Sequence, residues 1–261
     1  MATEKTFGFI IATCLRESRH LNVLYRCLES LFKYHPNQKK VVIIDYSSKN
    51  ELVNQVMSIY SDVIFERSTE NIAADMLMKQ FFKDKKYFDT AILLHDGMKI
   101  KKEMVVDKIE DVKYIWHFTN HRIYWSTITE PETDFNRLHN IVTHDDLLIY
   151  LINNNIRKED FKNYCKYIYY QKDKWCGAFG GLCIIRHDFL LKLDQLTGII
   201  DFEKEMSTNR LRRAAESIVG LACQYVTGRN MEDAYDGLFH DGYRGNNYQG
   251  NIISKISFDR K

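Results

Sequence analysis

The sequence lacks the features that mark several classes of protein. No apolar run approaches 18 residues, so we expect no membrane-spanning helix. The 37 Lys and Arg residues nearly balance the 35 Asp and Glu residues, and a net charge of +2 gives no indication of nucleic-acid binding. The first residues, "MATEKTFGFIIAT", contain no basic region with a cleavage-type site, so we expect no secretory signal.

The six cysteines form no C-x-x-C pair, and most lie within apolar stretches, where cysteine behaves as a small hydrophobic residue. They are Cys14, Cys27, Cys165, Cys176, Cys183 and Cys223. We therefore expect reduced thiols in the core of an intracellular, cytoplasmic protein.

Glycine-rich phosphate-binding loops are also missing. The segment "ATCLRES" after the first predicted strand contains no glycine, so it does not match the dinucleotide-binding fingerprint. No Walker A sequence occurs elsewhere. A nicotinamide, flavin or P-loop domain is therefore not expected.

The first hundred residues do contain a regular alternation of strand and helix patterns. Short apolar runs predict strands, and apolar residues at helical spacing predict the helices between them, with Asn50 as the N-cap of the second helix. The strands are predicted at 7–13, 40–48, 62–68 and 89–97, and the helices at 21–32, 52–60 and 71–82. Strands that alternate with helices favour an α/β fold with a mostly parallel sheet.

The second half of the sequence is less regular. Strands are predicted at 112–119 and 181–186, with a further candidate at 122–128, and helices at 143–154, 158–171, 187–193 and 208–228, the last with Gly228 as its C-cap. No linker or repeat separates the halves. We expect one domain over 1–261, with a nucleotide-binding half (1–98) and an acceptor and catalytic half (99–261).

Polar residues follow all four predicted parallel strands, and they include Thr13, Asp45, Ser68, Asn71 and Asp96. Ligands of such sheets bind beyond the carboxyl ends of the strands. Ordinary loop polarity could explain any one of these segments, but four at one sheet edge favour a binding site.

Asp96 ends the buried strand "AILLH", where a carboxylate is costly to bury unless it is paired or bound to a cation. Mg²⁺ or Mn²⁺ would suit this carboxylate together with phosphate oxygens, and His95 could be a second ligand. Gly97 would allow a sharp turn or close approach to a ligand. The alternative is an aspartate that caps a helix or forms a turn.

Two later segments carry further candidates. The glycine-rich tail contains His240, Tyr243 and Arg244, residue types that suit a metal, a sugar ring and a phosphate, unless the tail is merely frayed. Glu216 lies in a predicted helix, where it is either a general base or the partner of Arg212 or Arg213 in an intrahelical ion pair.

The order of these motifs resembles that of GT-A fold glycosyltransferases, closest in layout to the inverting family 2 type, over about residues 6–245. The segments that carry the resemblance are "FIIATCLRES", "VVIIDYSS", "ENIAADMLMKQFF", "LLHDG", "WCGAFGGLCIIRHDFL" and "AAES". The resemblance implies that Asp45 reads the nucleotide base, that Thr13 contacts the nucleotide, and that Asn71 and Ala73 approach the donor.

"LLHDG" falls where this family carries its Asp-x-Asp metal motif, so Leu94 replaces the first carboxylate and Asp96 is the one that remains. The resemblance implies that Asp96 and His240 hold a divalent cation, Mn²⁺ or Mg²⁺. It also implies that Glu216 is the catalytic base, with Ser217 in place of a second acid.

The remaining site predictions concern the nucleotide sugar and the acceptor. Ser68, His95 and Arg244 are expected to bind the nucleotide sugar, and Trp175, Gly181 and Tyr243 to lie against the acceptor or stack on sugar rings.

These patterns lead to an expected function. It is metal-assisted, inverting transfer of a sugar from a nucleotide diphosphate sugar to a hydroxyl acceptor, such as a glycan. The alternatives are a sugar nucleotidyltransferase, a non-catalytic relative that binds nucleotides or partner proteins, and a retaining mechanism. No nucleic acid is expected as a partner.

Overall fold

Strands and helices alternate through the first hundred residues. The structure, a computed structural model, describes residues 6–38, 40–68, 72–119, 144–171, 174–178, 181–229, 238–239 and 251–256. Its first elements are β1 (Phe7–Thr13), α1 (Ser18–Tyr34), β2 (Val41–Asp45), α2 (Asn50–Ile59), β3 (Val63–Arg67), α3 (Ala74–Lys85) and β4 (Thr90–His95). The predicted alternation in this part of the chain is confirmed.

Short strands and helices follow β4. They are β5 (Met98–Ile100), β6 (Val112–Tyr114), β7 (Trp116–Thr119), α5 (His144–Asn154), α6 (Glu159–Tyr169), β8 (Cys176–Ala178), β9 (Cys183–Arg186), α7 (His187–Thr197), α8 (Ile199–Lys204), α9 (Asn209–Thr227), β10 (Leu238–Phe239) and β11 (Ile253–Lys255). Gly228 is the C-cap of α9 as predicted, since it has φ 69° and its N–H donates to the oxygen of Gln224.

Six strands form the central sheet, in the order β3-β2-β1-β4-β9-β6. β1 is parallel to β2 and β4, and β2 is parallel to β3. β9 is antiparallel to both of its neighbours, β4 and β6. This arrangement confirms the predicted α/β fold with a mostly parallel sheet, and it is consistent with a GT-A-like fold.

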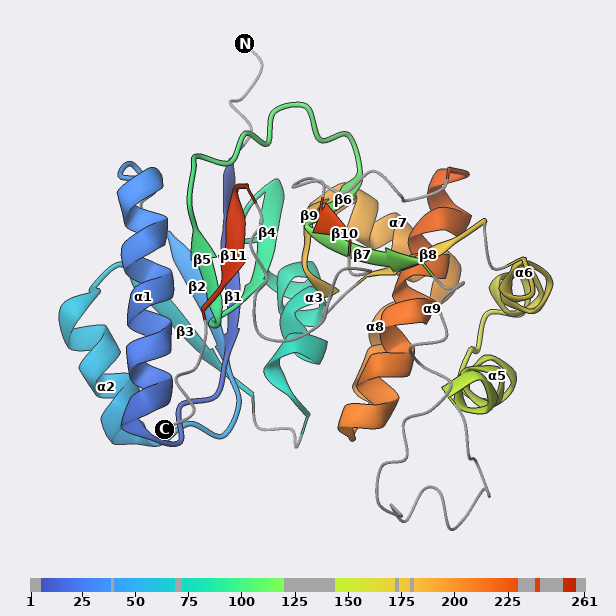
Figure 1. Cartoon of the computed structure of the whole chain (residues 1–261), viewed down its shortest axis with the longest axis horizontal. Helices are drawn as coiled ribbons and strands as arrows, with labels where there is room; N and C mark the ends of the chain where they lie inside the picture. The colour runs from blue at the N-terminus through green and yellow to red at the C-terminus, as the bar shows by residue number, and fades with distance from the viewer. Residues whose placement is uncertain are drawn as a thin grey trace.

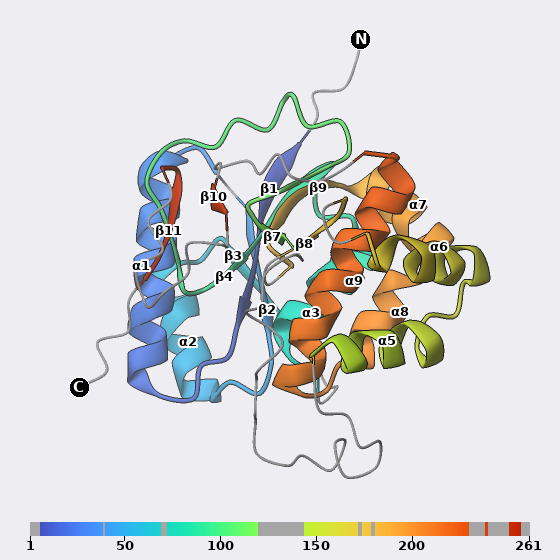
Figure 2. The same ribbon diagram turned by 45° about the vertical axis from the view of Figure 1, so that its right-hand side comes forward.

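Helices cover both faces of this sheet, as Figures 1 and 2 show. Successive side chains of a strand point to opposite faces. Ile10 of β1 therefore packs in one core with residues of α3 and α5 to α9, whereas Phe9 and Ile11 pack in a second core with α1 and α2. The apolar runs of the sequence are thus buried on both sides, as expected for parallel strands.

Two local predictions are wrong. Asn50 is the first residue of α2 rather than its N-cap, which is Lys49, and the Asn50 side chain accepts a hydrogen bond from Arg67 instead. Residues 112–119 form two strands in different sheets, β6 and β7, which Ile115 separates. The candidate strand at 122–128 lies outside the described residues.

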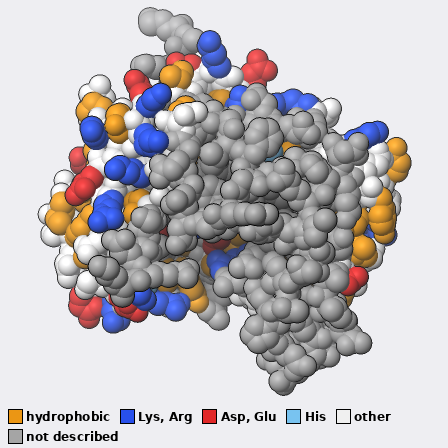
Figure 3. Space-filling view, in the orientation of Figure 1, with side chains coloured by type: hydrophobic (Ala, Val, Ile, Leu, Met, Phe, Trp, Pro, Cys, Tyr) orange, Lys and Arg blue, Asp and Glu red, His pale blue; other side chains and the backbone are white. Residues whose placement is uncertain are grey.

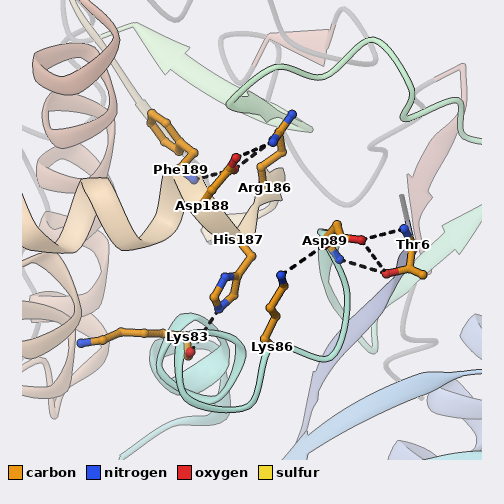
Figure 4. Close-up of polar contacts among 8 residues, drawn as sticks. All are labelled: Thr6, Lys83, Lys86, Asp89, Arg186, His187, Asp188 and Phe189. Atoms are coloured by element: carbon orange, nitrogen blue, oxygen red, sulfur yellow. Dashed lines mark hydrogen bonds and ion pairs between the residues drawn. The ribbon is translucent and has the colours of Figure 1, made fainter. Parts of the chain in front are cut away.

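The amino edge of the sheet is held by polar contacts (Figure 4). The hydroxyl of Thr6 donates to Asp89 Oδ2 at 3.1 Å, just before β1 and β4 begin. Nearby, His187 Nε2 lies 3.1 Å from the oxygen of Lys83, which attaches the start of α7 to the end of α3. The first contact joins the starts of β1 and β4, and the second joins two helices, α7 and α3.

No helix in the described part of the chain has both the length and the apolar character to cross a membrane. All six cysteines are free thiols; Cys14 is partly exposed and the other five are buried. The interpretation of the cysteines as core thiols is therefore confirmed for those five.

Candidate functional site

A cavity lies at the carboxyl edge of the sheet, where β1 and β4 end side by side. Its volume is about 310 Å³. Its described lining comes from the ends of β1, β2 and β4, the starts of α1 and α3, and one residue of α9. The lining residues are Ala12, Thr13, Cys14, His20, Val23, Tyr46, Ala73, Ala74, Asp75, His95, Asp96 and Arg212. This is the edge at which open parallel sheets bind ligands.

Thr13 and Asp96 meet at the wall of this cavity. The strands β1 and β4 are paired in register up to Ala12 and His95, so the next residue of each strand lies at the same level. The Thr13 hydroxyl donates to Asp96 Oδ2 at 2.6 Å. Burial raises the pKa of Asp96, and the Thr13 hydrogen bond, His95, His20 and the Gly97 N–H oppose that rise.

His95 lines the cavity beside Asp96. Its Nε2 atom is buried and has no hydrogen-bond partner among the described residues. A buried polar atom without a partner is costly, and at a cavity such an atom can form a hydrogen bond with a bound ligand or a water molecule. Gly97 has no positive φ, and a Cβ there would meet no atom within 4 Å, so the backbone does not require glycine at this turn.

Two helices begin at the cavity. His20 comes from the first turn of α1, and Ala73, which lines the cavity, is the N-cap residue of α3 and makes no side-chain capping hydrogen bond. The positive ends of helices favour anionic groups.

α9 adds a cation to the cavity, since Arg212 Nη1 lies 3.1 Å from Asp75 Oδ1 of α3. His20, Tyr46, Asp75 and Arg212 also line the cavity, although no sequence pattern predicted them there.

Asp45 ends β2 at the same edge, but its side chain is engaged within the loop that follows. The Ser48 hydroxyl donates to Asp45 Oδ1, and Arg67 Nε lies 3.3 Å from Oδ2. The carboxylate is 1% exposed, and burial raises its pKa against the opposing effects of Ser48 and Arg67. Neither Asp45 nor Ser68 is among the described residues that line the cavity.

Three predicted residues of the second half lie away from the cavity lining. Trp175 is 1% exposed, and its Nε1 donates to the oxygen of Tyr169 at 3.3 Å, so the ring packs in the core instead of offering a face to a sugar. Gly181 has φ 67°, and a Cβ there would lie 3.4 Å from Lys79 Nζ. Glu216 is half-buried on α9, one turn beyond Arg212.

Asn71, His240, Tyr243 and Arg244 lie outside the described residues, so their predicted roles remain predictions. No group of three or more His, Cys, Asp and Glu side chains among the described residues could hold a metal ion. Asp96 and His95 are the predicted metal ligands that the structure describes, and His240 lies outside the described residues. These residues alone therefore do not fit a bound cation.

No family model matches the chain, and no curated protein matches it. Among solved structures, one similarity is to the crystal structure of GalNAc-T7 with UDP, GalNAc and Mn²⁺. It has 16% sequence identity and a TM-score of 0.29, and it covers 38% of this chain and 19% of that chain. A similarity of this extent supports no conclusion about the function of the chain.

Proposed function

We propose that the cavity binds a nucleotide diphosphate sugar and that the chain transfers the sugar to a hydroxyl acceptor. The observation that carries the proposal is the meeting of Thr13 and Asp96 at the carboxyl edge of β1 and β4. Beside them lies His95 Nε2, which has no hydrogen-bond partner among the described residues. The order of motifs in the sequence, which resembles that of GT-A glycosyltransferases, supports the same ligand class.

The cavity has groups suited to each part of such a donor. The starts of α1 and α3 and the guanidinium of Arg212 favour the two negatively charged phosphates. Asp96, which the Thr13 hydrogen bond holds in place, would accept hydrogen bonds from hydroxyl groups of the nucleotide sugar. His95 Nε2 would form a hydrogen bond with the same ligand. The guanidinium of Arg212 would stabilise part of the negative charge of the leaving diphosphate.

Glu216 remains the proposed base. It is four residues beyond Arg212 on α9, and residues at that spacing share one helix face. In an inverting reaction its carboxylate would take the proton of the acceptor hydroxyl as the oxygen attacks the anomeric carbon and the bond to the diphosphate breaks. Asp45 would support the loop beside the nucleotide through Ser48 and Arg67 rather than contact the base with its carboxylate.

Ligand-induced thermal stabilisation tests the binding step. Donors with UDP, GDP, dTDP and CMP would be compared, with and without Mn²⁺. A ligand at 100 times its Kd stabilises the native state by about 2.7 kcal/mol. Each kcal/mol raises the melting temperature of a chain of this size by roughly 2–4 °C. We expect one nucleotide class to produce this rise and Asp96→Asn to abolish it.

Asp89→Asn is the matched control. Asp89 precedes the same strand and accepts the same kind of threonine hydrogen bond, from Thr6, at the opposite edge of the sheet (Figure 4). It should keep the full thermal shift. An equal shift in Asp96→Asn and the unmodified protein, or no shift with any donor, would contradict the proposal.

Glu216→Gln separates binding from transfer. We expect it to keep the thermal shift while release of nucleotide diphosphate falls by at least about 100-fold, the usual contribution of general base catalysis. Donor binding without turnover in the unmodified protein would instead identify a non-catalytic binding protein. The replacement of the first carboxylate of the metal motif by Leu94 favours this second candidate.

A further inference from the structure

A second cavity lies between the C-terminal half of α1 and the two-stranded sheet of β5 and β11. Its volume is about 670 Å³. Its described lining residues are Arg26, Glu29, Ser30, Lys33, Tyr34, Lys99, Lys101, Ser254, Lys255 and Ile256. None of these lines the cavity at the carboxyl edge of the sheet, so the two cavities are separate.

The second cavity is strongly basic. Its lining contains the five cations Arg26, Lys33, Lys99, Lys101 and Lys255 and a single carboxylate. That excess of four positive charges exceeds the net charge of +2 of the whole chain, so the rest of the chain is net negative. Figure 3 shows Lys and Arg side chains gathered on the side of the molecule where α1 and β5 lie in Figure 1.

Regular elements hold these cations in place. Lys33 follows Arg26 by seven residues on α1, a spacing that returns to the same helix face. On β5, Met98 and Ile100 are buried in the core, so Lys99 between them points outward. The Ile100 N–H donates to Ser30 Oγ at 3.0 Å, which ties β5 to α1 and fixes the width of the cavity.

Arg26, Lys33 and Lys99 form no ion pair with any residue that the structure describes, although Lys33 Nζ lies 5.3 Å from the centre of the Tyr34 ring. Like charges gathered in one concave surface repel one another, and field lines concentrate in such a surface. An anion with several charges would relieve that repulsion.

We infer that this cavity binds a compact ligand with several phosphate groups. Its volume is in the range of about 300–1,000 Å³ typical of small-molecule sites. The guanidinium of Arg26 suits two phosphate oxygens at once, and the lysines supply point charges around them. The phosphates can belong to a soluble molecule or to a lipid headgroup, since both present the same chemistry.

Titration calorimetry with inorganic tripolyphosphate tests this site on the full chain. We expect saturable binding to one site, at least about tenfold weaker in Arg26→Gln/Lys99→Gln. The control Lys166→Gln/Lys192→Gln removes two exposed lysines on α6 and α7 and so changes the net charge equally. It should bind like the unmodified protein, as should Arg212→Gln, which alters the first cavity.

Vesicle sedimentation identifies the source of the phosphates. Phosphatidylcholine vesicles with and without phosphatidylinositol bisphosphate are compared. If the protein sediments only with the vesicles that contain phosphatidylinositol bisphosphate, and Arg26→Gln/Lys99→Gln abolishes this, the ligand is a lipid headgroup. If the protein binds tripolyphosphate but does not sediment with these vesicles, the ligand is a soluble molecule. Absence of both, or equal weakening in the two double variants, overturns the inference.

Discussion

Lys79 is a charged residue that the structure buries almost completely. Its ammonium lies 2.7 Å from Glu203 Oε1, and the side chains of the pair are 2% and 1% exposed. Burial raises the pKa of Glu203, and Lys79 opposes that rise. Since α3 and α8 come from different halves of the sequence, this pair joins the two halves inside one core.

Removing one partner of a buried pair leaves the other charge without compensation. We expect Lys79→Met to lower the free energy of unfolding by about 3–5 kcal/mol. The double variant Lys79→Met/Glu203→Leu should recover most of that loss, because apolar side chains of similar volume replace both charges. Urea-induced unfolding monitored by circular dichroism measures the free energy of unfolding of both variants.

Lys83 supplies the control, one helical turn further along α3. Its ammonium lies at the same 2.7 Å distance from Asp194, but its side chain is 34% exposed. Lys83→Met should cost only about 0–1 kcal/mol. A similar loss in Lys79→Met and Lys83→Met would show that burial is not what makes the first pair important.

At the scale of elements, the close approach of α9 to β8 depends on Gly220. A Cβ at that position would lie 2.0 Å from the oxygen of Cys176 and 2.7 Å from the Cα of Gly177. Both of those atoms belong to the backbone of β8, so a clash cannot be relieved by a side-chain rotation.

Gly220→Ala should therefore destabilise the protein by at least about 1–3 kcal/mol, as overpacking does. At an exposed helical position the same change would stabilise the protein by about 1 kcal/mol. The sign of the change in the free energy of unfolding therefore distinguishes the two situations. Gly97→Ala is the control, because a Cβ there has no neighbour within 4 Å, and it should stay within about 0.5 kcal/mol. A higher melting temperature for Gly220→Ala would contradict the packing.

The elements that the sequence predicts well are those specified by local pattern. β1, β2 and β4 are continuous apolar runs, and their ends bring Thr13 and Asp96 to the cavity, as the parallel sheet predicts. Arg212 could not be placed in this way, because its approach to Asp75 depends on how α9 packs against α3. The serine three residues after Asp45 was a local signal that this carboxylate closes its own loop.

At the scale of the whole molecule, the sheet joins both halves of the sequence. β9 pairs with β4 of the first half on one side and with β6 of the second half on the other. The alternation of strand and helix patterns in the sequence does not reveal that β9 lies between β4 and β6. Strand pairing between distant segments depends on tertiary packing rather than on local periodicity. The pairing of β9 with both halves and the buried Lys79–Glu203 pair make the two halves depend on each other for stability.

We therefore expect residues 1–98 and 99–261 to unfold together. The three tryptophans, Trp116, Trp125 and Trp175, all lie in the second half, so their fluorescence reports on that half alone. Far-ultraviolet circular dichroism reports on the helices of both halves. In a single cooperative transition the two signals have the same midpoint in urea. If fluorescence changed at a clearly different urea concentration, the halves would be separate folding units, and the central sheet would not be one cooperative structure.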